Sequence, residues 1–381
     1  MADGSVGGFV RDRFAAVRGG FEANLASGAD VGAAFAATLE GETVVDLWGG
    51  WADEAKTRPW ERDTIVNVYS TTKTMTALTA LLLADRGELD FDAPVARYWP
   101  QFAAAGKAAV KVSHVMSHAT GLSGWKEPIT REDLYDWEKV TALLAAQAPY
   151  WEPGTACGYH GVTQGYLVGE VVRRITGKSL GTVFREEIAG PLGADFHIGL
   201  PASEDARVAD LIPPPPGGAI GDGPQSELSA NMSSNPPIDP RDTRTRAWRA
   251  AEIPAANGHG NARSIAEIHV LLANGGVAKG KRILSEAGCR KALEPQIEGT
   301  DLILGMPTRY GMGFGLPGAT VPLPNPNSLY WGGYGGSLVL IDMDARTTIA
   351  YAMNKMAPTT TGDMRALSLA TAMWSALAAP G

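Results

Sequence analysis

Cysteine is scarce in this chain, which has only Cys157 and Cys289 among its 381 residues. Two cysteines cannot build the disulfide framework that stabilises many small secreted domains. The N-terminal residues also lack the basic stretch and the apolar core of a secretory signal peptide. These absences favour a reduced, cytoplasmic protein.

Long apolar runs and excess positive charge are missing as well. No segment approaches the roughly 18 consecutive apolar residues that a transmembrane helix requires. Lysine and arginine together number 33, against 41 aspartates and glutamates, which gives a net charge of −8. This charge disfavours nucleic acid and anionic membranes as partners. The sequence leaves open whether the protein is a monomer or a homo-oligomer.

The G-x-S-x-G motif of the usual α/β-hydrolases is absent, but a different serine motif is present. Ser70 and Lys73 stand three residues apart at the start of an apolar segment that predicts a helix ending at Arg86-Gly87. Positions i and i+3 share a helix face, so the hydroxyl and the amine can meet. Burial and the positive helix N-terminus both disfavour a protonated lysine. A neutral amine beside a hydroxyl predicts a general base beside a nucleophile.

The S-x-x-K pattern alone is weak evidence for a catalytic site, because about one chance match is expected in a chain of this length. A second copy, Ser123–Lys126, lies in a loop without a helix to align its side chains. For Ser70, the structural alternative is a plain helix N-cap. The motif by itself leaves that alternative open.

Two later elements carry further polar chemistry. Tyr159 stands in a loop just before a predicted helix over residues 162–175. Four glycines occur within residues 332–336, between Trp331 and a predicted strand. Such glycines permit a close backbone approach, and the strand edge could offer an N–H group to an oxyanion. The alternatives are a half-buried surface tyrosine and an ordinary glycine-rich turn.

The order of apolar patterns predicts an α+β fold. We expect one antiparallel sheet built from both ends of the chain, flanked by terminal helices, with a mainly helical region inserted between them. The predicted strands cover residues 33–39, 43–51, 337–342 and 347–354, and the predicted terminal helices cover residues 7–27 and the segment through Leu367 and Leu377.

The same patterns divide the chain into two domains. Residues 1–64 and 256–381 would form the sheet domain, and residues 65–255 the mainly helical one. Within the latter, residues 201–255 are rich in proline and glycine. We expect this segment to be a rim or lid outside the core.

Taken in order, the three elements resemble the serine β-lactamase-like and penicillin-binding-protein-like superfamily, most closely the family VIII carboxylesterases related to class C β-lactamases. Residues 114–122 and Pro153-Gly154 look like further landmarks of that family. The resemblance implies the β-lactamase/transpeptidase-like fold. It also implies an acyl-enzyme on Ser70, with Lys73 and Tyr159 as general base and acid. No cofactor or metal is needed for this chemistry.

The resemblance further implies an oxyanion site made by the backbone N–H groups of Ser70 and Tyr334. We expect substrate contacts from four residues near these groups: His160, Trp331, Gly332 and Gly333. His114 and His118 are four residues apart, but no third ligand accompanies them, which favours hydrogen-bonded structural histidines over metal ligands.

Two departures from the family pattern bear on the substrate. Trp331 replaces the lysine that attracts a substrate carboxylate in the lactamases, and Gly161 replaces an asparagine that pairs with a substrate amide. Both changes remove polar anchors for a β-lactam and favour short, uncharged esters. The alternatives are a β-lactamase or D-alanyl-D-alanine carboxypeptidase, an acyltransferase, and a non-catalytic penicillin-binding sensor.

Overall fold

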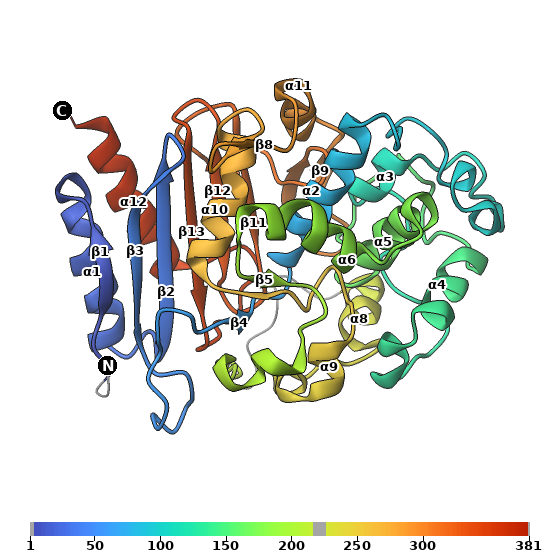
Figure 1. Cartoon of the computed structure of the whole chain (residues 1–381). Helices are drawn as coiled ribbons and strands as arrows, with labels where there is room; N and C mark the ends of the chain where they lie inside the picture. Colours follow the sequence, from blue (N-terminus) through green and yellow to red (C-terminus); the bar gives the residue numbers. More distant parts are fainter. Residues whose placement is uncertain (1–3, 216–225, 380–381) are drawn as a thin grey trace.

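The computed structural model describes residues 4–215 and 226–379. Within them, an antiparallel sheet has the strand order β1-β3-β2-β13-β12-β11 (Figure 1). Its strands are β1 (Gly7–Val10), β2 (Gly32–Leu39), β3 (Glu42–Gly50), β11 (Ser328–Gly332), β12 (Leu338–Asp342) and β13 (Thr347–Met353). Because β2 pairs with β13, the two ends of the chain meet in the middle of the sheet. This confirms the predicted α+β architecture.

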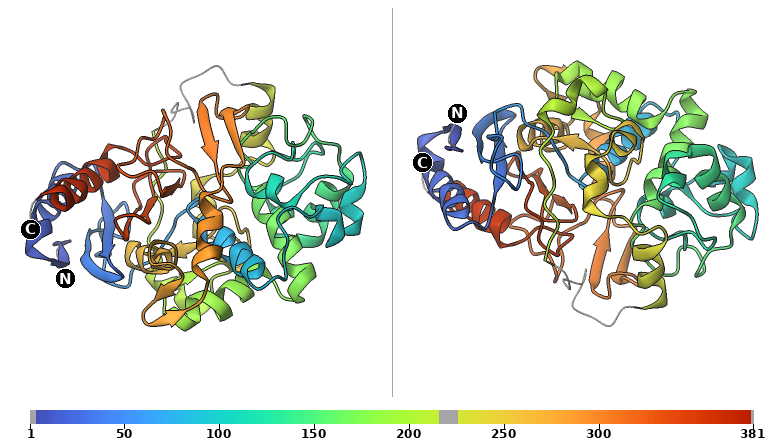
Figure 2. Two further views of the ribbon diagram at one scale, coloured as in Figure 1. Left: turned by 90° about the horizontal axis from the view of Figure 1, so that it is seen from above. Right: turned by 90° about the horizontal axis from the view of Figure 1, so that it is seen from below.

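Helices cover both faces of the sheet. The terminal helices α1 (Ala15–Ala26) and α12 (Met364–Ala378) contact each other and lie side by side on the outer face (Figure 1, Figure 2). Helix α10 (Ala262–Ala273) packs on β2, β12 and β13 from the opposite side. The apolar residues of these helices therefore complete the core on either side of the strands.

The helix predicted over residues 7–27 is wrong at its start. Residues Gly7–Val10 form the edge strand β1, paired with β3, and the helix begins only at Ala15. A Cβ atom on Gly8, whose φ is +98°, would lie 1.8 Å from the Asp46 carbonyl oxygen. This glycine lets the first strand approach its neighbour, and edge pairing overrides the helical spacing of Phe9 and Val10.

The inserted region lies beyond the sheet and contains most of the remaining helices (Figure 1). These are α2 (Thr72–Asp85), α3 (Val112–Met116), α4 (Trp137–Ala146), α5 (Thr163–Thr176), α6 (Leu180–Phe184), α7 (Gly190–Leu192), α8 (Glu227–Ser234) and α9 (Arg246–Ala250). Helix α2 contacts α5, α6 and the short helix α11 (Glu286–Arg290), and its residues 72–83 are all buried. The helix that follows Ser70 is therefore a rigid central element.

Short strands complete the described structure. They are β4 (Val66–Asn67), β5 (Phe196–His197), β6 (His259–Gly260), β7 (Val277–Ala278), β8 (Lys281–Arg282), β9 (Ile297–Thr300) and β10 (Pro307–Tyr310). Strand β6 pairs with both β4 and β5, which places β4 directly ahead of Ser70 and α2. None of the helices within residues 4–215 and 226–379 combines the length and apolarity needed to span a bilayer.

The prediction that residues 201–255 lie outside the core is wrong for several of them. Leu211, Trp248 and Ile253 are fully buried, and Trp248 Nε1 donates a hydrogen bond to Asn67 Oδ1 at 2.9 Å. Trp248 also contacts the Tyr69 ring, so this segment reaches the residues just before Ser70, which its low average hydrophobicity conceals. Residues 216–225 of this segment lie outside the described residues.

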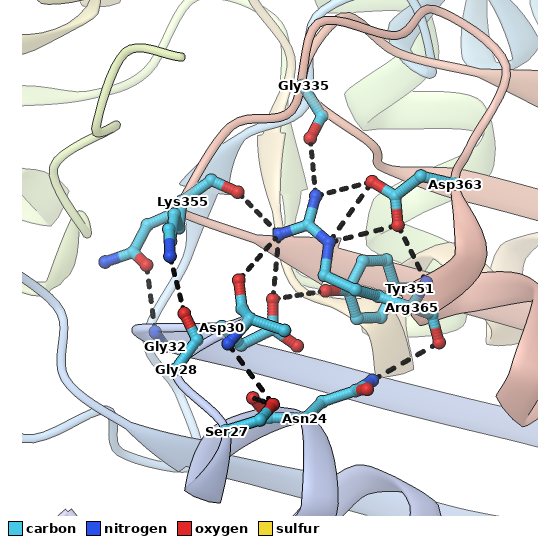
Figure 3. A network of polar contacts seen from close by, with 12 residues as sticks. Asn24, Ser27, Gly28, Asp30, Gly32, Gly335, Tyr351, Lys355, Asp363 and Arg365 are labelled. Atoms are coloured by element: carbon cyan, nitrogen blue, oxygen red, sulfur yellow. Dashed lines mark hydrogen bonds and ion pairs between the residues drawn. The ribbon is translucent and has the colours of Figure 1, made fainter. Parts of the chain in front are cut away.

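A buried ionic network joins α12 to the sheet and to the glycine turn after β11 (Figure 3). The Arg365 guanidinium donates to Asp30 Oδ1 at 2.9 Å, to Asp363 Oδ2 at 2.6 Å and to the Gly335 carbonyl at 2.9 Å. Tyr351 donates its hydroxyl to the same Asp30 oxygen at 2.6 Å. The Asp30 side chain is fully buried and that of Arg365 nearly so. The stability of this network therefore depends on the ion pairs that Arg365 forms with Asp30 and Asp363.

We predict that Arg365→Met lowers the free energy of unfolding by about 3–5 kcal/mol, because it leaves the Asp30 carboxylate buried without a counter-ion. The matched control is Arg290→Met, which breaks an exposed pair with Glu286 and should cost at most about 1 kcal/mol. Urea denaturation of both variants measures the difference. Equal effects would show that the buried network is not a major source of stability.

Candidate active site

Ser70 lies in the tight turn that connects β4 to α2. The preceding residue, Tyr69, has a φ of +43°, in the left-handed region that non-glycine residues seldom occupy. The Tyr69 ring makes edge contacts with Trp248 and Tyr334, at centroid distances of 6.3 and 5.5 Å. Aromatic packing thus holds a strained backbone next to Ser70, whose side chain sits at the N-terminus of a buried helix.

Lys73 is held against Ser70 by the backbone. Its Nζ lies 3.1 Å from Ser70 Oγ, and it donates hydrogen bonds to the carbonyl oxygens of Gly161 at 2.7 Å and Ala255 at 3.0 Å. The side chain is buried, and no carboxylate among the described residues forms an ion pair with it. Burial therefore lowers the pKa of Lys73 well below its usual value. A neutral amine has two N–H groups for the two carbonyls and one lone pair for the Ser70 hydroxyl.

Tyr159 contacts the same oxygen from another direction. Its hydroxyl donates to Ser70 Oγ at 2.5 Å, and its ring lies 4.9 Å from the Lys73 nitrogen. Burial raises the pKa of Tyr159 above the ordinary value of a phenol. Protonated Tyr159 can thus donate a proton and a neutral Lys73 can accept one, and both side chains contact the Ser70 oxygen.

Asp301, which the sequence did not single out, holds Tyr159 in place. One oxygen of this buried carboxylate accepts the Tyr159 backbone N–H at 3.0 Å and those of Ile303 and Leu304, each at 2.9 Å. The other oxygen accepts the Tyr310 hydroxyl at 3.0 Å. The aspartate is 142 residues away in the chain. No local motif connects it to Tyr159, so only the fold reveals this contact.

The glycine turn after β11 is fastened to the segment around Ser70. Ser337 Oγ donates to the Val68 carbonyl at 2.9 Å and lies 3.0 Å from Thr71 Oγ1, while Gly333 N–H donates to the Ser337 carbonyl. A Cβ atom on Gly333 would lie 2.1 Å from the Val68 oxygen, so only glycine permits this approach. Ser337 is a second residue that sequence analysis missed.

The expected oxyanion donors are the backbone N–H groups of Ser70 and Tyr334. Neither donates a hydrogen bond to a protein acceptor in the part of the chain that the structure describes. Tyr334 lies between Gly333, which is tied to Ser337, and Gly335, which is tied to Thr359, Ala357 and Arg365. Both chain neighbours of Tyr334 are therefore held in place, and Tyr334 itself lines a pocket together with Ser70.

Two pockets adjoin these groups. The first, here called the Ser70 pocket, encloses about 730 Å³ including its open mouth. Its lining comprises Tyr69, Ser70, Tyr159, Gly161, Val162, Met232, Ser233, Pro236, Ile238, Ala256, Leu304, Tyr334 and Thr360. The second, the Trp331 pocket, encloses about 420 Å³ and shares Tyr159, Leu304 and Thr360 with the first. No charged side chain among the described residues lines either pocket, so both suit uncharged groups.

Of the two glycines and the one histidine expected at the substrate, only one glycine lines a pocket. Gly332 lines the Trp331 pocket, whereas Gly333 lines neither pocket and packs against Val68. His160 is fully buried, with its ring nitrogens 2.6 Å from Thr120 Oγ1 and from the Gly158 carbonyl. Burial lowers the pKa of His160 to about 3, so the ring is neutral. Its location is that of a support behind Tyr159 rather than of a substrate contact.

His118 supports the tryptophan in a similar way. Its ring stacks on Trp331 at a centroid distance of 5.4 Å, and its Nδ1 accepts the His160 backbone N–H at 3.0 Å. The other histidine of the pair, His114, is half-buried and accepts the Lys111 backbone N–H at 3.4 Å. Within the described residues, no three histidine, cysteine or carboxylate side chains gather as metal ligands would.

The second S-x-x-K copy does not form a reactive pair. Lys126 Nζ donates to the Pro149 carbonyl at 3.4 Å and lies over the Tyr150 ring. The Ser123 hydroxyl is buried and has no hydrogen-bond partner among the described residues. The structure therefore distinguishes the two S-x-x-K copies, because only in the copy at the start of α2 does the lysine contact the serine.

Comparison with known proteins places this geometry in a family. The β-lactamase family model matches residues 18–372. An esterase/β-lactamase of Mycobacterium tuberculosis, LipL, is 36% identical over 374 residues, which cover 92% of this chain and 83% of that protein.

Solved structures of the same family have the same fold as this chain. The crystal structure of a family VIII carboxylesterase is 45% identical, with a TM-score of 0.93, and the match covers 98% of this chain and 100% of that one. A penicillin-binding protein homologue from Caulobacter crescentus is 40% identical, with a TM-score of 0.92 and the same coverage. The chain belongs to the β-lactamase family of serine hydrolases, in the branch that contains the family VIII carboxylesterases.

Proposed function

We propose that the protein hydrolyses short-chain, uncharged carboxylic esters through an acyl-enzyme on Ser70. The observation that carries this proposal is the set of contacts around Ser70 Oγ. A buried lysine amine whose N–H groups are occupied by carbonyls lies on one side, and a protonated tyrosine hydroxyl lies on the other. This arrangement supplies a base and an acid to the same oxygen without a cofactor.

The reaction follows from these positions. Neutral Lys73 takes the Ser70 proton as Oγ attacks the ester carbonyl carbon, and the resulting oxyanion accepts hydrogen bonds from the N–H groups of Ser70 and Tyr334. As the carbon–oxygen bond of the ester breaks, Tyr159 gives its proton to the leaving alkoxide and recovers one from the Lys73 ammonium. Water then attacks the acyl-enzyme by the same route, which releases the acid and restores Ser70.

The absence of charge in both pockets, within the described residues, supports an uncharged substrate. A carboxylate beside Trp331 would lose its hydration without gaining an ion partner. In a β-lactam, that carboxylate is attached to the ring of the leaving nitrogen. By analogy, we assign the leaving alcohol to the Trp331 pocket and the acyl group to the Ser70 pocket, with Tyr159 between them.

Slow β-lactam hydrolysis is the second candidate activity. The same nucleophile serves amide hydrolysis in the family, and the relative LipL carries both activities in its name. Acyl transfer to an alcohol instead of water would use the same acyl-enzyme.

Three expectations from the sequence stay predictions. They are the cytoplasmic location, the division into domains at residues 65–255, and a monomeric or homo-oligomeric state.

We predict that a fluorophosphonate adds a single covalent label, located on Ser70 by peptide mass, because Ser70 is the hydroxyl in contact with both Lys73 and Tyr159. Ser70→Ala should abolish labelling, whereas Ser123→Ala should label like the wild-type protein. A label on Ser123, or a labelled Ser70→Ala variant, would remove Ser70 from the mechanism.

We expect p-nitrophenyl butyrate to be hydrolysed with a kcat/KM at least about a hundredfold above that of a penicillin or cephalosporin. The reason is that a desolvated carboxylate beside Trp331 costs at least about 3 kcal/mol. Trp331→Lys should narrow the gap by restoring a cation. If the wild-type protein treats both substrate classes alike, the substrate assignment is wrong while the fold and nucleophile stand.

Burial of Lys73 should make the stability of the protein depend on pH. In the unfolded chain Lys73 binds a proton up to about pH 10.5, whereas burial lowers its pKa in the fold. Between these two pKa values the unfolded state holds one more proton, so stability rises with pH by up to about 1.4 kcal/mol per unit. This rise should appear in the wild-type protein relative to Lys73→Met. A pH-independent difference between the two proteins would mean that Lys73 is charged in the fold.

A further inference from the structure

The position of Gly161 is occupied by another side chain. A Cβ atom built on Gly161 would lie 2.6 Å from Met232 Sδ and 3.4 Å from its Cγ. In the lactamases that this chain resembles, an asparagine stands here and its amide pairs with an amide of the substrate. The space for that amide therefore holds the thioether of Met232, a side chain from α8, which is 71 positions further along the chain.

Helix α8 is fixed in the position that delivers Met232. Asn231 Nδ2 donates to the Trp125 carbonyl at 3.1 Å, and Asn231 Oδ1 accepts the Tyr150 hydroxyl at 3.1 Å. One turn later, Asn235 Nδ2 donates to the same Trp125 carbonyl at 2.8 Å. The loop that contains Trp125 is the second S-x-x-K copy, which thus anchors α8. These hydrogen bonds fix α8 and thereby hold Met232 over Gly161.

The chemistry at this place is apolar. Met232 lines the Ser70 pocket beside Val162, Pro236 and Ile238, and a thioether offers no hydrogen-bond donor. An amide in the acyl group would exchange its water there for at most the weak acceptor of the thioether, whereas a hydrocarbon chain has no hydrogen bond to lose. The Gly161 carbonyl oxygen beside it already accepts a hydrogen bond from Lys73.

We propose that Met232 is a specificity-determining residue, which selects acyl groups with a hydrocarbon chain and rejects those with an amide near the reacting carbonyl. This inference rests on the proposed esterase function and names the substrate class for its acyl pocket. Helix α8 and the loop that anchors it would then determine substrate preference, although neither contributes a reacting group.

Two esters of equal length test the proposal: p-nitrophenyl pentanoate and p-nitrophenyl N-acetylglycinate, which differ in an amide placed within the acyl chain. The measured quantity is the ratio of their kcat/KM values, in which the intrinsic reactivity of each ester cancels between variants. In Gly161→Asn/Met232→Ala, an amide side chain takes the space of the thioether. The ratio should shift toward the N-acetylglycinate by at least about tenfold, the worth of one well-placed hydrogen bond.

Controls separate the causes. Ser234→Ala changes an exposed residue of α8 that lines neither pocket and should leave the ratio unchanged. Met232→Leu keeps an apolar group in place and should retain the preference for pentanoate. If the double variant does not fold, Met232→Asn brings an amide to the same space from α8 and should shift the ratio in the same direction.

The outcomes are distinct. A ratio that stays within about twofold of the wild-type value in both asparagine variants, while pentanoate is still hydrolysed, overturns the role of Met232 and leaves the esterase function standing. A shift of equal size in Met232→Leu also overturns it, because polarity would then not be the cause. A wild-type protein that hydrolyses neither ester refutes the proposed function itself.

Discussion

The burial of Lys73 against Ser70 is the constraint on which the rest of the site depends. Burial without a carboxylate partner lowers the pKa of this amine, and only a neutral amine can take a proton from the serine. The carbonyl oxygens of Gly161 and Ala255 fix its direction by occupying its N–H groups. Three distant segments therefore meet at one nitrogen: the start of α2, the loop before α5, and the chain that leads to β6.

The other parts of the site are held by contacts made far from the reacting atoms. Asp301 secures the backbone of Tyr159, and Ser337 ties the glycine turn to Val68. Arg365 holds the same turn from the outer side through the Gly335 carbonyl (Figure 3). The site thus joins the sheet, the central helix and the β9–β10 hairpin. Its geometry depends on buried hydrogen bonds between residues that are far apart in the chain.

The sequence predicted most of the sheet and the local part of the site. The spacing of Ser70 and Lys73 depends only on helix periodicity, and the hairpin and the paired C-terminal strands follow from short apolar segments that flank turns. Asp301, Ser337 and Met232 could not be predicted in this way. Each acts on a residue at least 70 positions away. No local motif marks Asp301 or Met232, and the glycine run before Ser337 does not show which residue Ser337 contacts. Trp248 was missed because its segment is polar on average, although its indole is fully buried.

The most direct test of this account is the protonation state of Lys73 itself. With ¹³C-labelled lysine ε-carbons, its NMR signal can be assigned as the one lost in Lys73→Met and followed as the pH is raised. The account predicts that this signal reports a neutral amine at pH 8 and shows no change near pH 10.5, the region where an exposed lysine titrates. A signal that titrates with the exposed lysines would contradict the assignment of Lys73 as the base.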